Sequence, residues 1–388
     1  MAFSMLQLFL LGALGPRLVD ELGISPTVLG LTTTIGFGTA AVLSPVGGRI
    51  VDRFGPRRAL VTLLLVSAAA LGLIGAAPGA AVLLTAVALG GLPQALANPA
   101  TNKAILAVVP PARRGSVTGM KQSGVQLGAF AAGLPLAALA GGVGWRGAVW
   151  TAACSAVVVA LWARRALPAD PPATAKPKAR TASETATGAF RSSLLPRGTI
   201  AWLAVFSLLL GSGIASVNTY LALFGAQKLG MGPTAAAALV AVLGVTGIAG
   251  RVGWSRAAVP GRAEWLPGVL ALGAVGAAAL LAVALAVHPL AWAGAVAVGV
   301  FAVSGNAVSM VLVMQRAAPG RAGQDSALVS AGFFAGFAVG PPLFGLFAEA
   351  DRYGFGWTLV AVEFAAAAAV GFAWCVRDRR RRTRTAAA

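Results

Sequence analysis

Apolar and polar positions alternate along the chain in long blocks. Runs of mostly apolar residues are separated by short segments that contain charged residues, proline or glycine. A helix needs about 20 apolar residues to cross the hydrocarbon core of a bilayer, because only backbone that is hydrogen-bonded within itself can do so. The blocks predict twelve membrane-spanning helices, at about 1–19, 27–48, 58–77, 80–109, 114–140, 145–165, 198–226, 234–253, 264–287, 290–316, 325–348 and 355–377.

The first block is shorter than the others. Its apolar run before Pro16 has about 15 residues, or about 22 Å of helix, which is short of a span. It has no basic leading region and no small-residue cleavage site, so it does not resemble a signal peptide. We therefore expect the true start of the protein to lie upstream of Met1.

A single long polar segment divides the predicted helices six and six. Residues 166–197 are rich in proline, alanine, threonine and basic side chains, which predicts a disordered cytoplasmic linker. A plain tether is favoured over a regulatory segment. The predicted units are an N-terminal half at 1–165, a C-terminal half at 198–377 and a basic cytoplasmic tail at 378–388.

Glycines suggest that the two halves are related. At an offset of 212 positions, Gly124 and Gly128 of the fifth predicted helix fall on Gly336 and Gly340 of the eleventh. We therefore expect an all-α membrane protein of two pseudo-symmetric six-helix halves.

Composition and charge agree with a polytopic membrane protein. The 388 residues are 58% hydrophobic and 11% charged, and the net charge is +19. Of the 30 lysines and arginines, 24 fall in the loops after even-numbered helices or in the tail, and 4 fall in the opposite loops. This bias predicts that both termini are cytoplasmic in a plasma (inner) membrane. Because the basic residues are spread along the chain, nucleic-acid binding is disfavoured.

The chain has few residues that serve metal or enzyme chemistry. Cys154 and Cys375 lie in apolar runs without paired spacing, and His288 precedes a proline in a predicted loop. We expect no metal, no cofactor and no enzymatic activity, since paired acids and a recognisable nucleophile are missing. We expect a monomer whose partners are a small solute and the lipid bilayer.

A charged motif follows the second predicted helix. It reads Gly48-x-x-x-Asp52-Arg53-x-Gly55-x-Arg57-Arg58. Glycine at position 48 allows close helix approach, and Gly55 permits a tight turn. Asp52 requires a positive partner at the membrane edge, which the exposed amides of a helix N-terminus supply.

This motif resembles the signature between helices 2 and 3 of the Major Facilitator Superfamily, and helix count and linker agree. The resemblance implies that Asp52 docks on the start of helix 11, here Gln324-Asp325-Ser326. Arg53, Arg57 or Arg58 would then pair with Asp325. Such a conformational latch exists only while the cytoplasmic side is closed.

Polar residues recur on helices 4, 7 and 10, which face the central pathway in this superfamily, and also on helix 5. Buried amides need partners, so these stripes are expected to face each other, water or a solute; hydrogen bonding between helices is the alternative. The candidates are Gln94, Asn98 and Asn102 on helix 4, Gln122 and Gln126 on helix 5, Ser216, Asn218 and Tyr220 on helix 7, and Asn306 and Met310 on helix 10.

Two lysines and one acid lie inside predicted spans. Lys103 and Lys121 are each about 10 Å from the loop between helices 4 and 5, where a lysine must pair, face water or snorkel to the interface. Glu363, on the peripheral helix 12, is either a proton site or, more in keeping with its position, a structural acid. Without an acid on the cavity helices, the balance favours an anionic or polar neutral solute.

The sequence therefore predicts a secondary transporter that works by alternating access and is linked to protons. Proton-coupled efflux of drugs or metabolites is the alternative within the same class. The alternative of another class is a non-transporting membrane sensor on the same fold.

Overall fold

The computed structural model describes residues 1–170, 198–258, 263–316 and 322–386. The predicted disordered linker falls largely on 171–197, outside these residues. The described chain is helical. Its elements are α1 (Ala2–Ala13), α2 (Gly15–Leu22), α3 (Pro26–Phe54), α4 (Pro56–Ala76), α5 (Ala80–Val108), α6 (Pro111–Ala131), η1 (Ala132–Leu136), α7 (Ala137–Ala166), α9 (Thr199–Lys228), α10 (Pro233–Ala257), α11 (Leu266–Val283), α12 (Leu290–Ala297), η2 (Val298–Ala302), α13 (Val303–Arg316), α14 (Ala322–Glu349) and α15 (Tyr353–Ala386).

Ten helices are long and apolar enough to cross a membrane, or up to eleven if the bent pair α1 and α2 is one span. One of these candidates, Met120–Ala166, has 47 residues. It is two helices joined at Gly144, whose φ of 76° and ψ of 163° are not helical. Divided there, the described chain gives the twelve spans that the sequence predicts, within a few residues at most ends.

The structure corrects the first predicted span. Instead of one helix over 1–19, α1 and α2 are bent by 64° around Leu14. Pro16 has no N–H to bond to Gly12, and its ring disfavours helical geometry for the residue before it, so the helix breaks here. The helices that begin at Ala2 and Gly15 therefore form a broken span.

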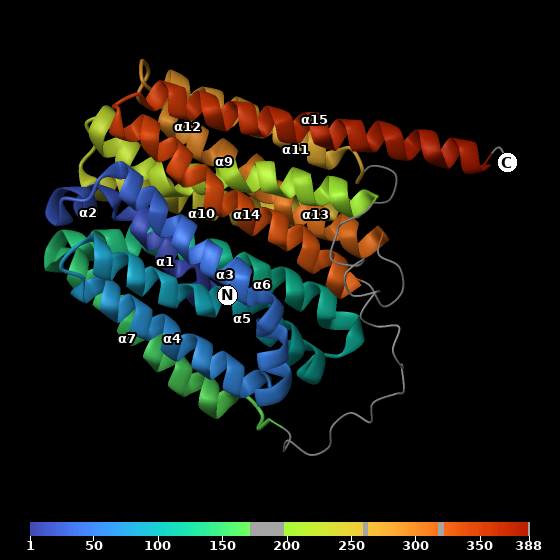
Figure 1. Cartoon of the computed structure of the whole chain (residues 1–388), viewed down its shortest axis with the longest axis horizontal. Coiled ribbons are helices and arrows are strands. Elements are labelled where there is room, and N and C mark those ends of the chain that lie inside the picture. The colour runs from blue at the N-terminus through green and yellow to red at the C-terminus, as the bar shows by residue number, and fades with distance from the viewer. Residues whose placement is uncertain (171–197, 259–262, 317–321, 387–388) are drawn as a thin grey trace.

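The helices form two groups that lie against each other (Figure 1). Helices α1 to α7 make the N-half and helices α9 to α15 the C-half. At one end of the bundle α3 passes into α4, and α7 terminates there as well. We call this end the linker end and the other one the opposite end. Helix α15 extends beyond the rest at the linker end, so the predicted tail 378–388 begins as helix and not as a separate segment.

Small residues allow α9 and α14 to pack backbone to backbone. A Cβ at Gly332, Gly336 or Gly340 would meet the backbone of Ala204, Leu208 or Ser212, respectively. Both sets are spaced by four residues, so one face of each helix forms a continuous seam. The glycines of α14 therefore have a direct packing role.

The two halves meet through α3 and α14 and through α6 and α10. A Cβ at Gly133, in the π-helical turn after α6, would meet the α10 backbone at Ala237 and Ala241. Phe37 of α3 contacts the rings of Phe334 and Phe337 of α14, with centroids 5.6 and 4.6 Å away. These contacts place the interface between the halves at the centre of the bundle, where a solute site is expected in such folds.

Candidate functional site

The signature loop is a tight connection between α3 and α4. Gly55 has a φ of 85°, a conformation that L side chains rarely adopt, and Pro56 opens α4. Gly48 and Asp52 lie on α3, but their side chains are outside the described part of the structure. Arg53 is exposed at the last turn of α3.

A residue that sequence analysis missed completes this loop. Asp170, four residues after α7, accepts the backbone N–H of Arg57 and of Arg58 on its two carboxylate oxygens, each at 2.8 Å. The Arg57 guanidinium donates to the carbonyl of Arg164. A Cβ on Gly55 would overlap the Asp170 carboxylate. Asp170 therefore supplies the N-terminal cap that α4 lacks.

The predicted latch pair is not made in this conformation. Asp325, in the first turn of α14, is 8% exposed. Among the described hydrogen bonds and ion pairs, none joins Asp325 to Arg53, Arg57 or Arg58. The Arg57 guanidinium instead donates within the N-half, to the carbonyl of Arg164.

The two intramembrane lysines face different helices. Lys121 of α6 donates to the side-chain oxygens of Asn98 and Asn102 on α5, at 3.2 and 2.7 Å. Lys103 reaches the carbonyl of Val51 near the end of α3, at 3.4 Å. The predicted helix 4 stripe is thus brought together with Lys121, whereas Lys103 lies beside the signature loop.

The third member of that stripe lines a small cavity inside the N-half. Gln94 is 2% exposed, and its Oε1 is buried without a hydrogen-bond partner among the described residues. The unpartnered Nε2 of Gln7 lines the same cavity, whose volume of about 10 Å³ suits about one water. Thr32, Thr33 and Phe37 of α3 also line it.

A second polar group lies where α6 meets α10 and α13. The built Cβ of Gly247 would lie 3.3 Å from Gln126 Oε1 and from Val303 Cγ1, and Arg251 Nη1 donates to the carbonyl of Gln122 at 3.2 Å. Helices α6, α10 and α13 also carry buried side-chain atoms without a described partner: Gln126 Oε1, Arg251 Nε, Ser304 Oγ and Asn306 Oδ1. Met310, one turn past Asn306 on α13, is partly buried. Arg251 was not among the candidates taken from the sequence, although an arginine shortly before the end of a predicted helix is visible there.

The helix 7 candidates lie in packed contacts. Ser216 and Asn218 are buried and donate to carbonyls of their own helix, at 3.0 and 2.9 Å. Tyr220 donates across the halves to the carbonyl of Pro26 at 2.7 Å, and its ring stacks on Phe344 at 4.7 Å. Of these contacts, the hydrogen bond of Tyr220 joins the two halves at the opposite end.

Glu363 of α15 is 9% exposed and accepts a hydrogen bond from Ser212 of α9 at 2.5 Å. It lies between two helices of the C-half and not among the residues around Lys121. The structure therefore separates the candidate acid from the candidate solute site.

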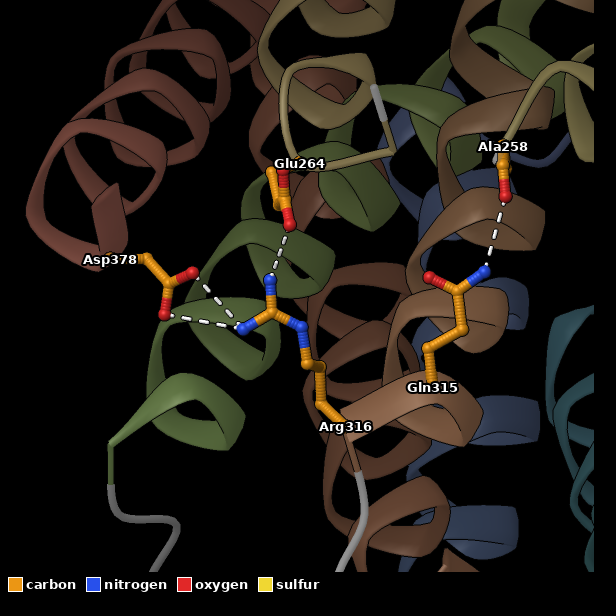
Figure 2. Close-up of polar contacts among 5 residues, drawn as sticks. All are labelled: Ala258, Glu264, Gln315, Arg316 and Asp378. Atoms are coloured by element: carbon orange, nitrogen blue, oxygen red, sulfur yellow. Dashed lines mark hydrogen bonds and ion pairs between the residues drawn. The ribbon is translucent and has the colours of Figure 1, made fainter. Parts of the chain in front are cut away.

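Figure 2 shows an ionic cluster at the linker end of the C-half. The guanidinium of Arg316, at the end of α13, lies between Glu264 at 2.7 Å and Asp378 of α15 at 3.0 Å. Gln315 donates to the carbonyl of Ala258 at 3.1 Å. Sequence analysis missed this cluster because its members come from three separate segments.

The part of the chain that the structure describes holds no group of three or more histidine, cysteine or acidic residues placed to bind a metal.

Solved structures share the fold of this chain. A bacterial homologue of the human lysosomal transporter Spinster, in an inward-facing and unoccupied conformation, superposes with a TM-score of 0.79 at 18% identity, covering 96% of this chain and 94% of that one. At this identity the likeness shows the fold alone.

Two curated relatives align over shorter stretches. The probable sulfoacetate transporter SauU of Cupriavidus necator is 28% identical over 131 residues, 34% of this chain and 30% of that protein. The multidrug resistance protein MdtH of Yersinia pestis is 32% identical over 160 residues, 39% of this chain and 38% of that protein. The chain thus spans about a third of the curated relatives it matches.

The family model described as Major Facilitator Superfamily matches residues 1–324, which include the signature loop, the Lys121 cluster and most of the C-half. Together with the twelve-span architecture, this match establishes that the chain belongs to the Major Facilitator Superfamily.

Proposed function

We propose that the protein is a secondary transporter that moves a small anionic or polar neutral metabolite by alternating access and couples this movement to protons. The observation that carries the proposal is the position of Lys121, whose ammonium is held by the amide oxygens of Asn98 and Asn102. An ammonium has three donors, and two neutral amides leave its charge uncompensated. Among the described residues Lys121 makes no ion pair, so an anionic solute is its natural partner.

Contacts between the halves support an arrangement that is closed at the opposite end. Arg17 donates to Thr234 at 3.3 Å, Thr27 to Glu349, and Tyr220 to Pro26. At the linker end the described ion pairs stay within one half, as in the Arg316 cluster, and the one hydrogen bond between the halves described on this side is that from Arg251 to the carbonyl of Gln122. By the distribution of basic residues this end faces the cytoplasm, so we assign the structure to an inward-open state.

The similarity to a probable sulfoacetate transporter supports the anionic class, since that solute carries acidic groups. The similarity to a multidrug resistance protein supports the efflux alternative. The two alternatives differ in the charge expected of the solute. A lipophilic cation would need a carboxylate beside the cavity, whereas the residues gathered at α5 and α6 present an ammonium and amides.

The binding experiment is thermal unfolding of the purified protein in detergent, with sulfoacetate, small carboxylates, neutral metabolites and lipophilic cations as probes. A ligand at 100 times its Kd adds about 2.7 kcal/mol to the folded state, which a shift in the midpoint reveals. We expect stabilisation by an anion. In Lys121→Ala the Kd should rise about 10- to 100-fold, because a charge-assisted hydrogen bond is lost.

The matched control is Lys103→Ala, which removes the same charge from a side chain that faces α3. This variant should keep the anion affinity of the wild type. Stabilisation by lipophilic cations alone, or equal loss in both lysine variants, would contradict an anion site at Lys121.

A further inference from the structure

A carboxyl group is buried in the middle of the C-half. Glu363 is 9% exposed and is the eleventh residue of α15, while its partner Ser212 is the fourteenth of the 30 residues of α9. Ser212 Oγ donates to Glu363 Oε1 at 2.5 Å. Glu363 Oε2 is buried and has no hydrogen-bond partner in the described part of the chain. One hydroxyl group offsets little of the cost of burying a carboxyl group at this depth.

The helices around Glu363 bring no charge near it. Helix α11, which packs along α15, has no charged or titratable residue in Leu266–Val283. On α9 the only charged residue, Lys228, lies 16 residues past Ser212, about 24 Å along the helix. The acids of α14, Asp325 and Glu349, lie near its two ends.

Along the chain, the nearest charged residues are Arg352, just before α15, and Arg377 on α15, at 11 and 14 residues, which is about 16 and 21 Å. The other titratable groups on the packed helices are Tyr220, Tyr353 and Cys375. Without a cation at hand, an ionised carboxylate here would be costly, and binding a proton removes that cost.

The same side chains touch the α9–α14 seam inside the C-half. A Cβ on Gly340 of α14 would overlap the backbone oxygen and Oγ of Ser212, so α14 rests directly on the partner of the acid. Two residues before Gly340, the carbonyl of Ala338 accepts a hydrogen bond from Thr34 of the N-half at 2.6 Å. A chain of direct contacts thus runs from α15 through α9 and α14 into α3.

We propose that Glu363 is the proton-binding site of this protein and that Ser212 positions it, so that proton binding and release act on the α9–α14 seam. This inference rests on the proposed function as a transporter. The neutral acid is compatible with the tight seam seen here. When the proton leaves, the carboxylate requires water, which the packed seam excludes, so the ionised form favours a conformation in which α9 and α14 are loosened.

The first test is independent of any solute. Infrared spectroscopy of the purified wild-type protein at neutral pH should show the carbonyl band of a buried protonated carboxyl group. The band should be absent in Glu363→Gln and present in Asp20→Asn, a control that removes an exposed acid on α2. A wild-type spectrum without this band, or a band that survives in Glu363→Gln, would overturn the proposal.

The second test uses proteoliposomes and the solute found by the stabilisation assay. Glu363→Gln should lose accumulation driven by a proton gradient, while exchange of solute without a gradient continues and becomes independent of pH. Ser212→Ala keeps the acid and should shift the pH profile. Gradient-driven accumulation in Glu363→Gln with the wild-type pH profile would refute the proton site, whereas loss of exchange in the wild type would refute transport itself.

Discussion

Lys103 and Lys121 have the same charge and lie at similar depth, yet they contact different helices. The sequence pattern predicts both inside the membrane, where a lysine must pair, face water or snorkel to the interface. It could not say which neighbouring helix each would face, because that depends on how α3, α5 and α6 are packed. Only Lys121 meets the amides that the helix 4 pattern had singled out.

Arg316 was not singled out by the sequence pattern, yet in the structure it pairs with two acids. Its side chain is 20% exposed, and those of Glu264 and Asp378 are 10% and 16% exposed. Its guanidinium also lies 5.8 Å from the ring of Trp374. The cluster connects the start of α11, the end of α13 and the end of α15.

We predict that Arg316→Met lowers the stability of the C-half. Removal of the cation leaves two largely buried carboxylates without their shared partner, at a cost of about 1–3 kcal/mol after allowance for their partial exposure. The midpoint of thermal unfolding in detergent should fall. Arg256→Met, which removes an exposed arginine from neighbouring α10, is the control and should unfold like the wild type; equal midpoints for all three proteins would speak against the cluster.

The helices were predictable because each one that crosses the bilayer needs an apolar run of similar length. Apolar runs and charged breaks gave the twelve spans, and the observed helices end within a few residues of most predicted limits. The break between α1 and α2 was missed, since a run that contains Pro16 near its end was read as one helix. The π-helical turns at Ala132–Leu136 and Val298–Ala302 have no signal in an apolar pattern.

The cap on α4 was also beyond a sequence reading. Asp170 binds Arg57 and Arg58 over separations of 113 and 112 residues, and the segment that contains it was interpreted as part of a tether. The structure shows that the first residues of this segment belong to the signature loop.

We predict that Asp170→Ala loosens the start of α4. Loss of a side-chain cap costs about 0.5–2 kcal/mol. Hydrogen exchange of the Arg57 and Arg58 amides should become faster, and Asp170→Asn should restore part of the protection because an amide oxygen still accepts one bond. The linker variant Glu184→Ala removes the same charge and should leave these amides unchanged. Unaltered exchange in Asp170→Ala would show that the cap is unimportant.

At the scale of the whole molecule, the described contacts differ between the two ends of the bundle. The opposite end is closed by Tyr220 and by the pairing of Thr27 with Glu349, while the signature loop is held by its own half. In an outward-open state the seals would change places, and Asp52 would meet the start of α14. The family signature predicted this device, whereas only the contacts indicate the state in which it is seen.

We predict that Asp52→Asn shifts the population toward the inward-open state, because a neutral side chain interacts less favourably with the helix N-terminus that it meets when the linker end closes. The reporter is a single cysteine at position 102, where Asn102 is exposed, in a background without Cys154 and Cys375. Its labelling by a water-soluble thiol reagent should become faster in Asp52→Asn. Asp20→Asn serves as the control. Equal labelling rates would argue against the latch.

The central claim is that an anionic solute crosses the membrane by way of Lys121. The most direct measurement is uptake of labelled sulfoacetate and small carboxylates into proteoliposomes that contain the wild type, Lys121→Ala or Lys103→Ala. The account predicts saturable anion uptake by the wild type and by Lys103→Ala, and little or none by Lys121→Ala. Movement of lipophilic cations without any anion flux, or anion uptake that Lys121→Ala leaves intact, would contradict it.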